Sequence, residues 1–464
     1  MAKMKKDHLS KQEFSWILYD WANSVYATVI MSTLFPIYFA TIAADASGQA
    51  GDVIWGYGTS AATLMVAVLA PLLGSVADFR GMKKKLLLCC ILVGTSFTLT
   101  MAIFDQWQWM LAGYIVSYMG FSLANLFYDS LLTDITTPER MHMISAKGYA
   151  FGYISSGLVP IAVVLIMSFS AHSIESAGYT AVKAAVVITS LWWGLFAIPM
   201  LINCRQTYFM EPPAEGILRA YFHNLDKKAK EIALNKPIFL YMLAYFCYID
   251  GVGTVIRMAT SYGVTIGLDA RKMLLSLIIT QVVAIPCSLL FARLADKIGI
   301  RRILLAGCGI YVLICVIGFE MGFSLENAAI AANVAQVSGG EAAYNAIYVP
   351  ALARSQTLFW ILAVLVGTSQ GGMQALSRSQ FGKIIPRERS NEYYGFFDIF
   401  GKFATVIGPL LYSFSASVTN RSSVGIISLT LLFLLGIILL LLTPKEAFAS
   451  GEGHPLSDTA GEKH

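Results

Sequence analysis

Two polar residues lie one helical turn apart inside the first long apolar run of the chain. Asp20 and Asn23 occur in the sequence WILYDWANSVYATVI, residues 16–30. A charge near the centre of a bilayer costs about 3 kcal/mol on insertion scales, so such residues usually face a bundle interior or a water-filled cavity. A carboxylate in that position can bind a cationic group or exchange a proton. Asp20 is therefore predicted to handle substrate or protons, and a purely structural pairing is the alternative.

Further ionisable and amide side chains interrupt other apolar runs. They are Asp129, Asp250, Arg257, Gln370, Gln374, Arg378, Asp398 and Lys402. A free amino acid needs a carboxylate for its ammonium group and a cation for its carboxylate, so this mixture of charges is compatible with a zwitterionic substrate. Structural readings stay open, because Asp398 and Lys402 can neutralise each other at i, i+4, and Asp250 can pair with Arg257.

Twelve long apolar runs would have to position these side chains. Hydrophobic residues make up 56% of the 464 residues and charged residues only 13%, which is typical of a membrane protein with many spans. A spanning helix needs about 20 mostly apolar residues. That length predicts spans at 14–43, 53–78, 84–104, 107–133, 142–170, 180–203, 236–266, 272–296, 301–321, 356–382, 391–418 and 422–443. The predicted fold class is all-α integral membrane.

Basic residues gather in alternate connections between these runs. The clusters are Lys3, Lys5, Lys6 and Lys11; Arg80 with Lys83, Lys84 and Lys85; Arg140 with Lys147; Lys227, Lys228 and Lys230; Lys297 with Arg301 and Arg302; and Lys383 with Arg387 and Arg389; Lys445 follows the last run. The positive-inside rule makes these connections and both termini cytoplasmic. The net charge of +5 then reflects membrane topology, and nucleic-acid binding is not supported. Because no organellar signal is evident, a bacterial inner membrane is the predicted location.

The chain also repeats itself. The stretch GSVADFRGMKKKLLL at 74–88 and the stretch ARLADKIGIRRILL at 292–305 share the pattern A-D-x-x-G-x-basic-basic, and a second pair of similar stretches ends at Pro160 and Pro409. A six-plus-six duplication explains both pairs. It predicts an amino-terminal bundle over 1–203, a cytoplasmic linker over 204–235, a carboxy-terminal bundle over 236–443 and a cytoplasmic tail over 444–464. The extra residues of the second half are assigned to a polar outer loop, 322–355.

The repeated A-D-x-x-G loop resembles the signature of the major facilitator superfamily, and the resemblance covers nearly the whole chain. Four motifs narrow it: WILYDWANSVY (16–26), FYDSLLTDI (127–135), QGGMQALSRS (370–379) and GKFATVIGP (401–409). They resemble the branch that contains bacterial transporters of unknown substrate and the fungal vacuolar amino-acid effluxer linked to autophagy. In that branch the second motif more often reads F-Y-N, so Asp129 is an added carboxylate in this chain.

The resemblance implies two six-helix bundles that rock around a central site. It also implies that the repeated loops latch the two halves on the cytoplasmic side, with each Asp engaging basic side chains or a helix amino terminus. The residues assigned to these gating loops are Asp78, Gly81, Lys84, Asp296, Gly299 and Arg301. The glycines permit a tight turn. For the basic residues, a role in membrane topology alone is the alternative.

Taken together, the sequence predicts a secondary transporter of a small solute, with amino acids favoured and proton coupling as a hypothesis. No phosphate-binding loop indicates the use of ATP, and neither the cysteines nor the histidines have metal-site spacing, so no enzyme activity, cofactor or metal is predicted. The expected partners are the solute, protons and membrane lipids. Two alternatives remain: an exporter of amphipathic drug, lipid or sugar cargo, which an apolar cavity with paired charges would favour, and a non-transporting receptor or scaffold.

Overall fold

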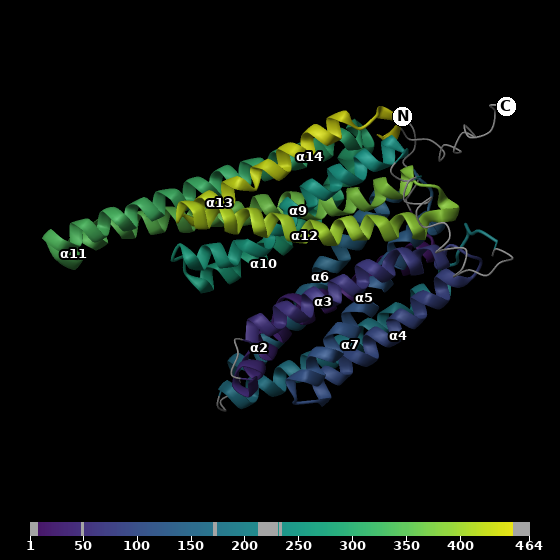
Figure 1. The fold of residues 1–464 in the computed structure, drawn as a ribbon, viewed down its shortest axis with the longest axis horizontal. Helices are drawn as coiled ribbons and strands as arrows, with labels where there is room; N and C mark the ends of the chain where they lie inside the picture. The colour runs from purple at the N-terminus through teal and green to yellow at the C-terminus, as the bar shows by residue number, and fades with distance from the viewer. Residues whose placement is uncertain (1–7, 48–50, 170–173, 212–230, 232–233, 449–464) are drawn as a thin grey trace. The chain divides into compact units, whose positions relative to one another are not determined.

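The computed structural model describes residues 8–47, 51–169, 174–211, 231 and 234–448. In these residues the chain forms long helices joined by short connections (Figure 1), together with an isolated parallel bridge between Phe79 and Met210. Most of the predicted linker 204–235 and of the predicted tail 444–464 lies outside the described residues.

The chain divides into two compact units. The first contains the residues up to Glu231 together with Arg378–Ile399, and the second contains Ile232–Ser377 and Phe400–Ala449. The last residues of α11 (Ile300–Ile384) and the first residues of α12 (Ser390–Thr419) therefore belong to the same unit as the amino-terminal helices.

The helices of the amino-terminal part follow the predicted spans. They are α1 (Lys11–Tyr26), the π-helix η1 (Ala27–Ser32), α2 (Leu34–Ser47), α3 (Gly51–Ala77), α4 (Met82–Ile103), α5 (Trp107–Ile135), α6 (Met141–Phe169) and α7 (Ile174–Asn203). A capping box starts α1: the Ser10 hydroxyl accepts from the Glu13 amide at 3.1 Å, and the Ser10 amide donates to the Glu13 carboxylate at 2.8 Å. The predicted span 14–43 is interrupted, because the π-helix ends at Thr33 with φ −128° and ψ −85°.

Stacked aromatic side chains fill the interior of the first unit. Trp16 stacks on Tyr128 with 4.4 Å between ring centroids, and Tyr26 stacks on Phe121 at the same separation. Large aliphatic side chains on other helices of this unit, such as Ile37 of α2 and Val68 of α3, are instead largely exposed. Helices that are apolar on both their inner and outer faces are expected in a lipid environment.

The remaining helices are α9 (Lys236–Thr265), α10 (Ala270–Ile298), α11 (Ile300–Ile384), the 3-10 helix η2 (Arg387–Arg389), α12 (Ser390–Thr419), α13 (Ser422–Ser428), α14 (Thr430–Leu442) and the 3-10 helix η3 (Lys445–Phe448). Ten helical segments in the described residues are long and apolar enough to cross a membrane. One of them is α11, which contains two of the predicted spans, and α6 coincides with the predicted span 142–170. Every predicted span is thus largely helical, although 14–43 is divided among α1, η1 and α2, and 422–443 between α13 and α14.

The predicted outer loop 322–355 is wrong as a loop, because its residues continue α11 as helix on both sides of Gly340. Gly340 has φ 67° and ψ −162°, a conformation accessible almost only to glycine. The alanine-rich flanks favour helix, and Arg354 forms an ion pair with Glu320 at 3.0 Å between the two arms. Figure 1 shows α11 extending beyond α10 and α13 of the same unit.

Candidate functional site

The guanidinium of Arg378 lies at the centre of a buried ion cluster in the first unit. Its Nη1 atom donates to Asp129 at 3.1 Å, and its Nη2 atom donates to Asp20 at 3.0 Å. The hydroxyl of Ser145 accepts from Nε at 3.0 Å, and the carbonyl of Ser145 accepts from Nη2 at 3.2 Å. Two carboxylates therefore share one cation, and we call Asp20, Asp129 and Arg378 the ion triad.

Four helices supply these residues: α1 carries Asp20, α5 carries Asp129, α6 carries Ser145 and α11 carries Arg378. The members of the triad differ in exposure. The side chains of Arg378 and Asp20 are 5% and 10% exposed, whereas that of Asp129 is 29% exposed. Asp129 is thus the carboxylate that a solute or a proton can reach most easily.

Aromatic rings surround the guanidinium. Its central carbon lies 4.5 Å from the ring centroid of Tyr149, 4.7 Å from that of Trp16 and 5.3 Å from that of Tyr128. Trp16 is held in place by a 2.9 Å hydrogen bond from its indole nitrogen to the carbonyl of Tyr128. These distances are in the range of cation–π attraction. The rings stabilise the charge of Arg378 and restrict the directions from which a ligand can approach.

Only a residue without a side chain fits beside the triad on α6. A Cβ atom added at Gly148 would overlap the Asp20 carboxylate and would lie 3.2 Å from Nη2 of Arg378. Ser145, Gly148 and Tyr149 are spaced i, i+3 and i+4, so they share one face of α6. That spacing is the sequence signal for Ser145 and Tyr149, neither of which is among the predicted site residues. Asn23 lies nearby on α1 and donates to Asn125 at 2.6 Å.

The first gating loop binds the amino terminus of α12. The carboxylate of Asp78 accepts from the Asn391 amide at 2.9 Å, from the Asn391 side chain at 2.7 Å and from the Glu392 amide at 2.9 Å. Amides at a helix amino terminus lack partners inside the helix and favour an anion. Burial raises the pKa of Asp78 to about 7, while Lys83 and the hydrogen bonds from Asn391 and Glu392 oppose the rise.

A second buried contact beside this loop uses Lys83. The Nζ atom of Lys83 lies 2.6 Å from Asp134 and 3.1 Å from the hydroxyl of Ser390, and the side chains of Lys83 and Asp134 are fully buried. Lys84, which the sequence analysis assigned to the gating loop, is only partly buried. Gly81 has φ 73° and caps the amino terminus of α4.

The second repeated loop differs from the first. Asp296 is exposed, whereas Asp78 is buried. Gly299 has φ 93° and ends α10, where its amide donates to the carbonyl of Ala295. Arg301 donates to the carbonyl of Leu441 at the end of α14 and lies over the ring of Phe448. Similar sequences thus have different surroundings.

Asp250 of α9 binds backbone and hydroxyl groups. It accepts from the Gly408 amide at 2.7 Å and from the hydroxyl of Thr254 at 3.3 Å. Arg257 is exposed and adds an electrostatic attraction to Asp250, but across the described residues no ion pair within 4.0 Å joins the two side chains. Gln374, Asp398 and Lys402 are each partly buried.

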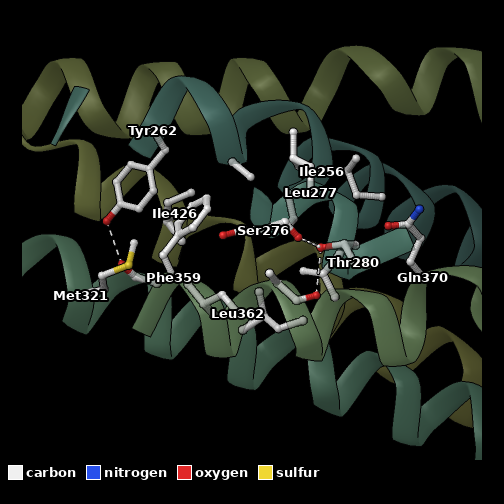
Figure 2. A pocket seen from close by; sticks show the side chains of 16 residues that line it. Ile256, Tyr262, Ser276, Leu277, Thr280, Met321, Phe359, Leu362, Gln370 and Ile426 are labelled. Carbon is white, nitrogen blue, oxygen red and sulfur yellow. Dashed lines mark hydrogen bonds between the residues drawn. The ribbon is translucent and has the colours of Figure 1, made fainter. Parts of the chain in front are cut away.

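Gln370 lies at one end of a pocket in the second unit (Figure 2), lined by residues of α9, α10, α11 and α13. The hydroxyl groups around the pocket are occupied by backbone carbonyls: Tyr262 donates to Gly318 at 2.7 Å, and Thr280 donates to Ser276 and Ala363 at 3.0 Å. The remaining lining is largely aliphatic and aromatic, so the pocket offers an apolar surface. Within the described part of the chain, no group of three or more His, Cys, Asp or Glu residues could hold a metal ion.

Comparison with known proteins connects this architecture to a family. The family model described as "Vacuole effluxer Atg22 like" matches residues 52–143 and 134–448. An uncharacterized MFS-type transporter of Bacillus subtilis, YxiO, is 38% identical over 444 residues, which is 94% of this chain and 96% of that protein. Autophagy-related protein 22 of Eremothecium gossypii is 21% identical over 470 residues, covering 89% of this chain and 86% of that protein.

Solved structures agree with the fold. A proton:xylose symporter of the major facilitator superfamily has a TM-score of 0.65 at 13% identity, covering 94% of this chain and 95% of its own. A bacterial homologue of the iron transporter ferroportin has a TM-score of 0.62 at 12% identity, covering 93% and 98%. The predicted all-α membrane fold and the predicted absence of enzyme activity are confirmed. The chain belongs to the Atg22-like vacuole effluxer family of the major facilitator superfamily, and it is a multi-pass membrane transporter.

Proposed function

We propose that this transporter moves a small zwitterionic solute, with amino acids as the favoured class, and couples that movement to protons at the ion triad. The single observation that carries the proposal is that two carboxylates, Asp20 and Asp129, share one buried guanidinium, Arg378. The match to the family model of vacuole effluxers supports a small solute as the transported molecule.

The charge of the triad supports a binding role. One cation and two carboxylates leave a net charge of −1 in a buried place, where desolvation costs several kcal/mol per ion. A proton or a substrate ammonium group would neutralise that excess charge. A fully neutral pair would have no such requirement, so the second carboxylate is the feature that favours a coupled transporter.

A zwitterion can exchange partners with the triad without losing ion contacts. Its carboxylate replaces Asp129 on the planar fork of Arg378, which suits two-point binding of a carboxylate. Its ammonium group binds the carboxylate of Asp129 that has been released. Asp20 stays on Arg378 throughout and keeps the guanidinium in place. A proton on Asp129, the more exposed carboxylate, would release Arg378 in the same way.

The remaining parts of the proposal concern topology and gating. We place the protein in a bacterial cytoplasmic membrane with both termini cytoplasmic, in line with the basic clusters and with the Bacillus relative. The two six-helix bundles, 1–203 and 236–443, would alternate access to the solute. Asp78 and its loop would hold the amino terminus of α12 in one of the two states.

Counterflow in proteoliposomes tests the proposal. Vesicles with purified protein are preloaded with a pool of unlabelled amino acids, and the uptake of single labelled amino acids is measured. We expect a subset to accumulate transiently, and we expect little accumulation with the Asp20→Asn or Arg378→Ala proteins. If folded wild-type protein accumulates none of them, the amino-acid assignment is wrong.

The apolar pocket supports a second candidate function, the transport of an amphipathic cargo. Its hydroxyls are already bound to backbone carbonyls, so it offers little to a polar solute but can hold an aliphatic or aromatic group. The same vesicles, preloaded with an amphipathic fluorescent cation, distinguish the two. Counterflow of the dye in the absence of amino-acid counterflow would favour this candidate.

A further inference from the structure

The first residues after α7 lie against the first gating loop. The side chain of Gln206 accepts from the Gly81 amide at 2.9 Å and donates to the carbonyl of Ala77 at 3.1 Å. It therefore binds the start of α4 and the end of α3 at once. Such end groups have no partners inside their helices, so a single amide side chain satisfies both sides of the turn.

The backbone of the same segment pairs with the loop. The Met210 amide donates to the carbonyl of Asp78 at 2.9 Å, and the Arg80 amide donates to the carbonyl of Met210 at 3.2 Å. These two bonds form the parallel bridge between Phe79 and Met210. Arg80 also lies over the ring of Phe209, 5.2 Å from its centroid. We call the segment Gln206–Met210 the strap.

The strap shares an acceptor with the buried lysine. The amides of Thr207 and Tyr208 donate to Oδ1 of Asp134 at 2.7 and 2.9 Å, while Lys83 lies against Oδ2 of the same carboxylate. Lys83 in turn donates to Ser390, the first residue of α12. A change in the strap therefore alters the surroundings of a lysine that contacts α12.

A direct contact links the strap to the residues that precede α12. Arg387 donates to the hydroxyl of Tyr208 at 2.6 Å, and its guanidinium lies 5.0 Å from the centroid of the Tyr208 ring. All of these residues belong to the first unit. The strap thus binds the gating loop, the end of α5 and η2, and it does so with side chains and with main-chain amides.

We infer that the strap is a positioning element of the transporter: it fixes the loop that carries Asp78, so that docking of the linker controls how firmly this loop holds the amino terminus of α12. The linker then takes part in gating, beyond joining two bundles. A ligand, a modification or a partner that pulled on the linker would weaken the contact of Asp78 with Asn391 and Glu392. The inference does not depend on which solute is carried.

Hydrogen–deuterium exchange of the full-length protein in lipid nanodiscs tests the inference. The variant is Gln206→Ala, and the reporter is a peptide covering residues 387–396, which contains the amides bound by Asp78. We expect roughly fivefold faster exchange there, the effect of about one net hydrogen bond. The connection 104–106 at the other ends of α4 and α5 should keep its exchange rate.

Two further variants make the test specific. Arg205→Ala changes an exposed neighbour of the strap and should leave the 387–396 peptide unchanged. Tyr208→Phe removes only the hydroxyl that Arg387 binds, and should also speed exchange at 387–396, so it replaces Gln206→Ala if that protein does not fold. Faster exchange confined to 206–211, or an equal effect of Arg205→Ala, would overturn the inference.

Discussion

A Cβ atom at Gly148 would overlap the carboxylate of Asp20, so the backbone of α6 lies close to α1 where Asp20 binds Arg378. Asp20 has little room to move away, because it is largely buried and Arg378 binds it at 3.0 Å. The geometry of the triad therefore depends on a residue that carries no functional group of its own.

The substitution Gly148→Ala should reduce solute exchange by at least about tenfold, since displacements near 1 Å at a binding group can cost about 100-fold. The melting temperature should also fall, because the added Cβ must displace the buried Asp20 carboxylate and such overpacking typically costs about 1–3 kcal/mol. Gly157→Ala on the same helix is the control, as its Cβ would meet only Ile161 at 3.6 Å. Equal exchange in the Gly148→Ala and Gly157→Ala proteins would contradict the role given to the triad.

Arg378→Lys should also lose most exchange activity, although the positive charge is kept. A lysine ammonium cannot present the planar fork that binds Asp20, Asp129 and Ser145 at once. Arg354→Lys is the matched control, because its ion pair with Glu320 is exposed and contributes about 0–1 kcal/mol. Counterflow rates of the two proteins measure the difference, and full activity of Arg378→Lys would show that two-point binding is unnecessary.

Lys83 and Lys84 are adjacent in sequence and should respond very differently to replacement. Lys83→Ala leaves Asp134 buried without its cation, which typically destabilises a protein by about 3–5 kcal/mol. Lys84→Ala changes a partly exposed side chain and should stay within about 0.5 kcal/mol. Thermal unfolding in detergent compares the two, and similar melting temperatures would contradict the buried ion pair.

The pH dependence of stability should carry a contribution from Asp78, which directly follows the span Ile54–Ala77. Burial raises its pKa to about 7, whereas the carboxyl group of an unfolded chain has a pKa of about 3.9. The folded protein therefore holds this proton more tightly, so its stabilising effect is complete below about pH 4 and is lost as the pH rises to about 7.

The melting temperature of the wild-type protein should consequently fall, relative to that of Asp78→Asn, as the pH is raised from about 5 to about 8. The amide side chain of the variant does not titrate, so the difference between the two curves isolates this carboxyl group from every other pH effect. Parallel curves over that range would exclude a raised pKa at Asp78.

The sequence predicted the spans and the charged members of the triad for the same physical reason. A charge in an apolar run is costly and therefore conspicuous, which singled out Asp20, Asp129 and Arg378. Ser145 and Tyr149 are neutral and carry no such cost, so their spacing on α6 is a weak signal, and their contacts with Arg378 identify them. Arg378 binds both carboxylates because α1, α5 and α11 pack together. Residue spacing along one helix does not determine how helices distant in sequence pack.

The structure differs from the sequence-based prediction at other residues whose neighbours in space cannot be read from the sequence. Lys83 and Lys84 occur in one basic run, and only the phase of α4 decides which of them is buried. Asp78 and Asp296 occupy equivalent motif positions, but the strap lies against the loop of Asp78. The polar residues of 322–355 favour a loop, but its alanines favour helix more strongly, and one glycine is enough for the turn.

Proton movement in proteoliposomes is the most direct test of the central claim, that the second carboxylate of the triad couples solute to protons. A solute gradient is imposed across vesicles that contain a pH-sensitive dye, for the wild-type and the Asp129→Asn proteins, and exchange of labelled solute is measured in parallel. Asp129→Asn leaves a neutral pair of Asp20 and Arg378. We predict that the wild-type protein moves protons with the solute, and that Asp129→Asn moves no protons and exchanges solute more slowly, because the ammonium group of the solute has lost its carboxylate partner. Equal proton movement in both proteins would contradict the account.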